Sequence, residues 1–378
     1  MRASCALSYL FLNIFINIKL FGRGLMAESN DFSQTQDATN DAIANFAHDE
    51  QSLKRKIPNL LHNYPAIVPF VVLLGAVIVF SLVVGERFFS PFTLTLILQQ
   101  VAIVGIVASA QSLIILTAGI DLSVGAIMVL SSVIMGKLSF DYGIPAEFAI
   151  VTGLLVGLLI GTVNGILVAK VKLPPFIVTL GMWQIALAIN FLYSGSEVIR
   201  SQDIARDAPL LQYFGNTIQL GGAVFTYGVI LLLILFVILS YVLTQTAWGR
   251  HVYAVGDDPD AAELSGVNVS KTLISVYALA GLICALAGWV LIGRLGSVSP
   301  QAGQLANIES ITAVVIGGIS LFGGRGSIAG SLFGALIVGV FTLGLRLMGA
   351  DVQWTYLLIG ILIIAAVSAD QYIRKASA

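Results

Sequence analysis

Long apolar segments recur along most of this chain, and they constrain its fold more than any other feature. A helix that crosses a membrane needs about 20 consecutive, mostly apolar residues. Hydrophobic residues make up 57% of the chain and charged residues only 10%, whereas a soluble domain carries about 25% charged residues. The sequence therefore predicts an all-α polytopic membrane protein with about ten transmembrane helices. The ten candidate segments are 66–84, 92–117, 124–138, 145–168, 176–193, 224–243, 272–292, 308–322, 327–345 and 354–368.

Several of these segments are short and closely spaced, with glycines between them. Gly119 separates two runs within 92–138, and Gly323 and Gly324 separate two within 308–345. Membrane proteins tolerate irregular backbone where it is buried in protein or lines a cavity. We expect broken or re-entrant helices in both places.

The chain divides into four parts by composition. Residues 1–25 are expected to be a non-native leader, with Met26 as the true start, because no small-residue cleavage site follows the apolar stretch. A signal peptide or a membrane anchor is the alternative. Residues 26–64 are expected to form a cytoplasmic, largely disordered tail, because the first half is acidic and polar. Residues 65–373 form the transmembrane domain, and residues 374–378 a cytoplasmic C-terminus.

Lys and Arg indicate the orientation, because they are enriched in cytoplasmic loops. If Lys54, Arg55 and Lys56 are cytoplasmic, ten Lys and Arg residues from position 54 onward fall on the inner side and six on the outer side. This count places both termini and the loop 244–271 in the cytoplasm.

Two sets of glycines recur every four residues, which places each set on one helix face and allows close approach of a neighbouring backbone. We interpret both as packing within one subunit in preference to a dimer seam. They are Gly153, Gly157, Gly161 and Gly165, and then Gly326, Gly330 and Gly334.

Uncharged polar residues lie within several apolar segments, where each can either link helices or line a polar route. They include Gln111, Asn164, Gln184 and Asn190. No charged residue is expected in the middle of a span, which argues against a proton relay or an ion-coupled pump. The energy source should then lie on another chain.

The polar loop 244–271 carries signals for a short helix. Asp258 suits the N-cap, Pro259 the first turn, and Gly266 a left-handed C-terminal residue. These signals predict a helix of about two turns over 259–265. Because so short a helix is unstable alone in water, we expect another surface to hold it.

No catalytic or cofactor chemistry is indicated. Residues 265–272 lack the two glycines of a phosphate-binding loop, the two cysteines are far apart, and no metal-ligand or nucleophile motif is present. The net charge of −1 gives no reason to expect nucleic acid. We therefore predict no enzymatic activity, no cofactor and no metal on this chain.

Four segments occur in the order found in one transporter family: TAGIDLSVG (117–125), LPPFIVTLG (173–181), WGRHVYAVG with AAELSGV (248–256 and 261–267), and VIGGISLFGGRGS (315–327). In these the chain resembles the ribose-type monosaccharide ABC importer permeases. The resemblance implies a homodimer in the bacterial inner membrane lipid, a cytoplasmic ATPase that uses ATP and Mg²⁺, and a periplasmic sugar-binding protein.

The resemblance also implies roles for particular residues. The family's coupling helix, which contacts the ATPase, falls on the predicted short helix. Its residues here are Asp257, Asp258, Pro259, Asp260, Glu263, Leu264 and Gly266. In this family the pore needs only weak polar contacts with the sugar, for which Gln111, Asn164, Gln184 and Asn190 are the candidates.

The identity of the substrate stays open at this point. Ribose, fructose, xylose, arabinose and galactose all fit the resemblance. Alternatives are a related permease for a branched-chain amino acid, a nucleoside or a sugar-like signal, a secondary transporter, and a membrane enzyme or scaffold.

Overall fold

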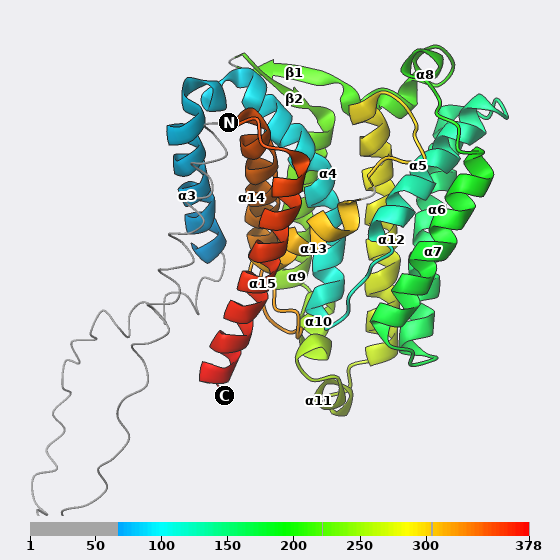
Figure 1. The fold of residues 1–378 in the computed structure, drawn as a ribbon. Coiled ribbons are helices and arrows are strands. Elements are labelled where there is room, and N and C mark those ends of the chain that lie inside the picture. Colours follow the sequence, from blue (N-terminus) through cyan, green and yellow to red (C-terminus); the bar gives the residue numbers. More distant parts are fainter. Residues whose placement is uncertain (1–66, 221, 304, 378) are drawn as a thin grey trace, which may run out of the picture. The chain divides into compact units, whose positions relative to one another are not determined.

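The computed structural model describes residues 67–377 except Gly221 and Gln304. The expected leader, the expected tail and the Lys54–Lys56 cluster lie outside these residues. Figure 1 shows the arrangement of the helices. In chain order the elements are α3 (Ile67–Val84), η1 (Gly85–Phe89), α4 (Pro91–Leu116), α5 (Val124–Phe140), α6 (Ala146–Ala169), α7 (Pro175–Ser194), α8 (Ser201–Asp207), η2 (Pro209–Gly215), β1 (Thr217–Leu220), β2 (Ala223–Thr226), α9 (Tyr227–Gln245), α10 (Ala247–Asp257), α11 (Pro259–Leu264), α12 (Val269–Leu295), α13 (Ala306–Ile316), α14 (Ile328–Leu347) and α15 (Val352–Ser377).

Each of the ten predicted apolar segments contains a helix. Seven helices of the described chain are long and apolar enough to cross a membrane, and three shorter apolar helices lie within α5, α13 and α15. The prediction of a mostly helical polytopic protein is confirmed. α15 continues to Ser377, through residues expected to form a short C-terminal tail.

Two helices form the centre of the bundle. α12 packs along α6, α4 and α5, and α4 also packs on α14, α13 and α9. α12, α4 and α14 are the most buried of the long helices, whereas α3 and α7 are the least buried. Apolar residues on α3 and α7, such as Leu82 and Leu192, are therefore available to lipid.

Both predicted breaks are present. α4 ends at Leu116 and α5 begins only at Val124, with Ala118 in the left-handed region (φ 59°). α13 has only 11 residues and ends at Ile316, earlier than the predicted 322. The chain then stays irregular to Ser327, because Gly318, Gly323 and Gly324 all adopt positive φ.

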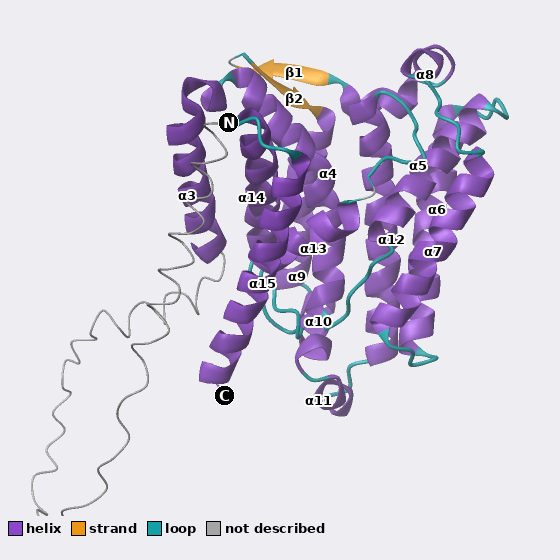
Figure 2. Cartoon of the chain, in the orientation of Figure 1, coloured by secondary structure: helices purple, strands orange, loops and turns teal. Residues whose placement is uncertain are grey.

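The segment between α7 and α9 forms structure that the sequence did not predict. It holds α8, η2 and a two-stranded antiparallel hairpin with Thr217 opposite Thr226. The hairpin is the only sheet of the described residues (Figure 2). α8 and the hairpin lie at one end of the bundle and α11 at the opposite end (Figure 1). We call these the hairpin end and the α11 end.

Candidate functional site

α10 packs against the bundle and against α11, and the sequence analysis did not predict this helix. Thr246 caps α10 by accepting a hydrogen bond from the Gly249 amide at 3.2 Å. Val252 and Val255, three residues apart, are buried against the bundle. Trp248 Nε1 donates to Ser275 Oγ of α12 at 2.8 Å. The Thr cap and the spacing of the two valines were the available sequence signals for this helix.

α11 forms as its sequence predicts. Asp258 Oδ1 accepts hydrogen bonds from the amides of Asp260 and Ala261, each at 3.0 Å. At the other end Gly266 adopts φ 86°, and the amides of Gly266 and Val267 donate to the carbonyls of Glu263 and Ala262. This is a Schellman motif, which satisfies the last carbonyls of the helix. The predicted helix 259–265 is confirmed to within one residue.

The residues predicted to contact an ATPase are all on the surface. Asp257, Asp258, Pro259, Asp260, Glu263, Leu264 and Gly266 are exposed. Ala262 faces inward and is buried, so it anchors the helix. Leu264 is 91% exposed. α11 therefore presents an apolar tip with carboxylates around it.

Close backbone contacts connect α10 to both breaks in the bundle. The Gly324 amide donates to the Leu116 carbonyl at 3.0 Å. A Cβ atom on Gly256 would collide with the Leu116 carbonyl and with the Gly324 amide. Tyr253 Oη donates to the Gly326 carbonyl at 2.9 Å. The end of α4, the end of α10 and the irregular segment 317–327 thus meet without intervening side chains.

Two of the four pathway candidates meet at the break between α4 and α5. With its amide oriented to satisfy both groups, Gln111 donates to the Asp121 carbonyl at 3.0 Å and accepts from the Asp121 amide at 3.3 Å. Asn164 Nδ2 of α6 donates to Ser123 Oγ at 3.0 Å. Asp121 Oδ1 in turn accepts from the amide and hydroxyl of Ser123. These hydrogen bonds stabilise the irregular turn between α4 and α5.

The other two candidates lie elsewhere. Asn190 of α7 is buried and donates from Nδ2 to the Pro300 carbonyl at 2.8 Å. Gln184, on the same helix, is exposed. The structure does not bring all four residues into one cluster, and their role in a substrate pathway stays a prediction.

The first glycine stripe packs within the subunit. Cβ atoms on Gly157 and Gly161 would collide with the backbone of α12 at Gly281, and one on Gly165 would meet Ile274. Gly153 faces Met135 of α5. This stripe is what allows α6 and α12 to approach so closely.

The second stripe is shorter than predicted. Gly330 and Gly334 of α14 face the backbones of Gly317 and Ala313. Gly326 lies before α14, which begins at Ile328, and has φ 124°. The prediction that Gly326 belongs to the helix face is wrong, because its conformation is one that a helix cannot contain.

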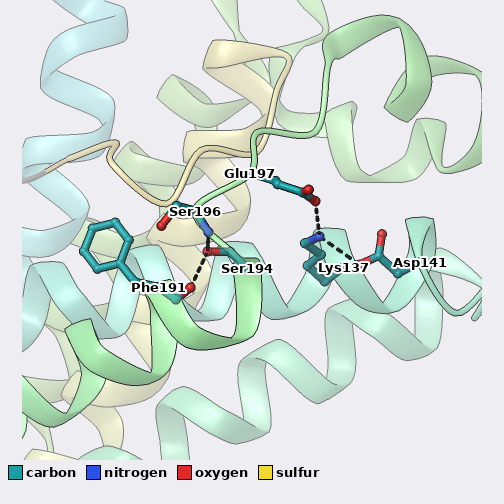
Figure 3. A network of polar contacts seen from close by, with 6 residues as sticks. All are labelled: Lys137, Asp141, Phe191, Ser194, Ser196 and Glu197. Atoms are coloured by element: carbon teal, nitrogen blue, oxygen red, sulfur yellow. Dashed lines mark hydrogen bonds and ion pairs between the residues drawn. The ribbon is translucent and has the colours of Figure 1, made fainter.

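A charged network at the hairpin end was also missed by the sequence analysis (Figure 3). Lys137 Nζ lies 2.9 Å from Asp141 Oδ2 and 3.3 Å from Glu197 Oε2, and the lysine side chain is only 8% exposed. Ser194 Oγ accepts from the Ser196 amide at 3.1 Å. The network ties the end of α5 to the segment after α7. Sixty residues separate Lys137 from Glu197, which explains why no local pattern indicated it.

Within the described residues, no group of three or more His, Cys, Asp or Glu side chains is placed to hold a metal ion. The polar features described above are a surface helix, two irregular breaks, the cluster around Asp121 and the network around Lys137.

Comparison with known proteins identifies the family. Residues 93–367 match the model of the family described as branched-chain amino acid transport system / permease component. The chain belongs to this family. It is 65% identical to a fructose import permease protein of Rhizobium meliloti over 350 residues. This aligned region covers 93% of the present chain and 97% of the relative.

More distant relatives are also permeases. A ribose import permease protein of Bacillus subtilis is 39% identical over 82% of this chain and 93% of its own length. A xylose transport system permease protein of Escherichia coli K12 is 31% identical over 83% and 94%. No solved structure matches the chain. This permease is thus a multi-pass membrane protein whose named relatives import sugars.

Proposed function

We propose that this permease is the membrane-spanning subunit of an ATP-driven ABC importer that carries a monosaccharide across the bacterial inner membrane. The observation that carries the proposal is 65% identity to a fructose import permease across nearly the whole of both chains. Fructose is therefore the first substrate to test, before the ribose and xylose of the more distant relatives. Arabinose and galactose are the remaining candidate substrates.

The permease is expected to act with three partners: a cytoplasmic ATPase, a periplasmic sugar-binding protein and a second copy of itself. ATP and Mg²⁺ would be used by the ATPase. The exposed, acidic and apolar-tipped α11 supports contact with the ATPase, since a six-residue helix gains stability from a partner surface. The opposite, hairpin end would then face the binding protein, and both termini the cytoplasm.

The contacts of α10 support a mechanical route for the energy of ATP hydrolysis. Movement of the ATPase would displace α11, and α10 would move with it. Because α10 touches both the end of α4 and the segment 317–327, the displacement would reach both breaks in the bundle. Rigid-body shifts at such breaks are the usual means of alternating access.

The test is uptake of radiolabelled fructose, ribose and xylose by cells that lack the chromosomal copy of this permease. Restoring the chain should restore rapid uptake of one sugar. The double variant Asp260→Lys with Glu263→Lys should abolish uptake and weaken association with the ATPase, because it reverses the charge around Leu264. Unchanged uptake and association in this variant would exclude α11 as the contact.

The same assay separates the alternatives. The family description names branched-chain amino acids, so labelled leucine and a nucleoside belong in the panel, as does a sugar-like signalling compound. A secondary transporter would lose uptake with an uncoupler and keep it when ATP is depleted. Copurification of an ATPase with the chain would argue against both that hypothesis and a membrane enzyme or scaffold.

A further inference from the structure

A partly buried carboxylate lies in the first turn of α13. Glu309 is the fourth residue of α13, and it faces Gln100 of α4. Gln100 is ten residues into α4, which is roughly 14 Å from the hairpin end of that helix at 1.5 Å per residue. A charged group at this depth in a membrane domain has a functional role as the default hypothesis.

Glu309 is only loosely bonded. Within the described residues, its carboxylate accepts one hydrogen bond, from Gln100 Nε2 to Oε2 at 3.4 Å, longer than the usual range of about 2.7–3.2 Å. Among the described residues, no Lys or Arg forms an ion pair with it within 4.0 Å, although Arg294 and Arg346 act on it electrostatically. An ionised carboxyl group can accept about four hydrogen bonds. Gln100 fills one of these acceptor positions.

The two side chains together offer what a sugar hydroxyl requires. The carboxylate accepts strong hydrogen bonds, and the amide of Gln100 both donates and accepts. A negatively charged ligand would be repelled by the carboxylate at close range, and an apolar ligand would leave it without a partner. Among uncharged ligands, the pair favours one that carries hydroxyl groups.

We propose that Glu309 and Gln100 contact a hydroxyl group of the neutral monosaccharide as it passes through the hairpin-end half of the permease. The proposal rests on the proposed function and adds residues that act directly on the substrate. The long Gln100–Glu309 bond suits such a role, since the sugar replaces a weak contact and can leave again.

The competing explanation is that this pair only links α13 to α4. The test therefore compares sugars as well as variants. The complete importer is reconstituted in vesicles with saturating sugar-loaded binding protein and ATP, and uptake is measured for the parent sugar and its single-deoxy analogues. The variants are Glu309→Ala, Glu309→Gln and Gln100→Ala. The control is Glu147→Ala, an exposed acidic residue in the first turn of α6.

If Glu309 bonds a sugar hydroxyl, Glu309→Ala should lower uptake of the parent sugar by about 10- to 100-fold, since a hydrogen bond to a charged group contributes roughly 1.5–3 kcal/mol. Uptake of the analogue that lacks this hydroxyl should change much less. The effect of the binding protein cancels, because the same analogue is compared between variants. Glu147→Ala should leave every rate unchanged.

Equal loss for the parent and all its analogues, with a lower melting temperature, would overturn the proposal in favour of a helix link. If Glu309→Ala does not assemble, Glu309→Gln decides the matter, because it keeps the size and one acceptor oxygen and should still alter the order of the analogues. A wild-type importer that moves none of the monosaccharides would instead contradict the proposed function, and this proposal with it.

Discussion

Leu264 has the highest exposed fraction of any large hydrophobic side chain in the described residues, at 91%. Exposed leucines on the apolar spans are available to lipid, whereas Leu264 lies on α11, outside the apolar spans. Leu264→Ala should therefore leave the stability of the purified permease within about 0.5 kcal/mol. If Leu264 is a hot spot of the ATPase interface, its removal should lower ATP-dependent uptake by about tenfold or more, since truncation of a hot-spot side chain costs about 2 kcal/mol or more.

The matched control is Leu192→Ala in α7, where the leucine is 82% exposed. Its removal should leave both uptake and ATPase copurification unchanged. Equal effects of the two substitutions on uptake and copurification would mean that Leu264 does not contact the ATPase.

Tyr253 gives a prediction about pH. Burial raises the pKa of its phenol above the ordinary value of 10.0, and the neutral hydroxyl donates to the Gly326 carbonyl. The stability from this group is fully present below pH 10.0 and is lost as pH rises through the raised pKa. Tyr253→Phe should cost about 1 kcal/mol near neutral pH.

Thermal unfolding in detergent checks this prediction, with scans at about pH 8 and about pH 10.5. The variant should lose less stability than the wild type between the two pH values. An equal loss in both proteins would show that the Tyr253 hydroxyl does not report on the contact between α10 and the segment 317–327.

At the scale of elements, the contact of α10 with both breaks predicts an uncoupled variant. Gly256→Ala places a Cβ against the Leu116 carbonyl and the Gly324 amide, neither of which is a flexible side chain. α10 must then move away from its neighbours, at a cost of roughly 1–3 kcal/mol. We expect ATP hydrolysis by the assembled importer to persist while sugar uptake falls by about tenfold or more.

Gly181→Ala is the matched control, because Gly181 lies in α7 with no atom near its Cβ position. That change should be neutral or slightly stabilising, as expected of an exposed helical glycine. Parallel loss of ATP hydrolysis and uptake in Gly256→Ala would indicate misfolding in place of uncoupling.

The sequence predicted most elements whose causes are local. Apolar runs of sufficient length specify the spans, and Asp258, Pro259 and Gly266 specify both ends of α11, because capping acts within a few residues. α10 and the hairpin 217–226 were missed, since short amphipathic segments give weak periodic signals beside long apolar ones. Contacts between distant residues, such as Asn164 with Ser123 or Lys137 with Glu197, had no local signal at all.

At the scale of the whole molecule, the proposal separates the route of the substrate from the source of energy. Concentrating a neutral sugar 100-fold requires about 2.8 kcal/mol, because each tenfold step is about 1.4 kcal/mol. An ion-coupled transporter obtains this energy through ionisable groups in its membrane helices. Ionisable groups do lie in the described part of this bundle, among them Glu309 of α13, Lys137 of α5 and Asp121 before α5. The assignment of the energy source to another chain therefore rests on α11, whose exposed surface suits contact with an ATPase.

We therefore expect the permease alone in lipid vesicles neither to hydrolyse ATP nor to accumulate fructose, with or without a proton or sodium gradient. Addition of the ATPase inside and of the loaded binding protein outside should start accumulation that depends on ATP and Mg²⁺. The readout is vesicle-retained label against time, with vesicles that carry the Asp260→Lys, Glu263→Lys variant as control. Accumulation driven by an ion gradient in the permease alone would contradict the assignment of the energy source to a separate ATPase. The energy would then enter through this chain, and contact of α11 with an ATPase would not be needed.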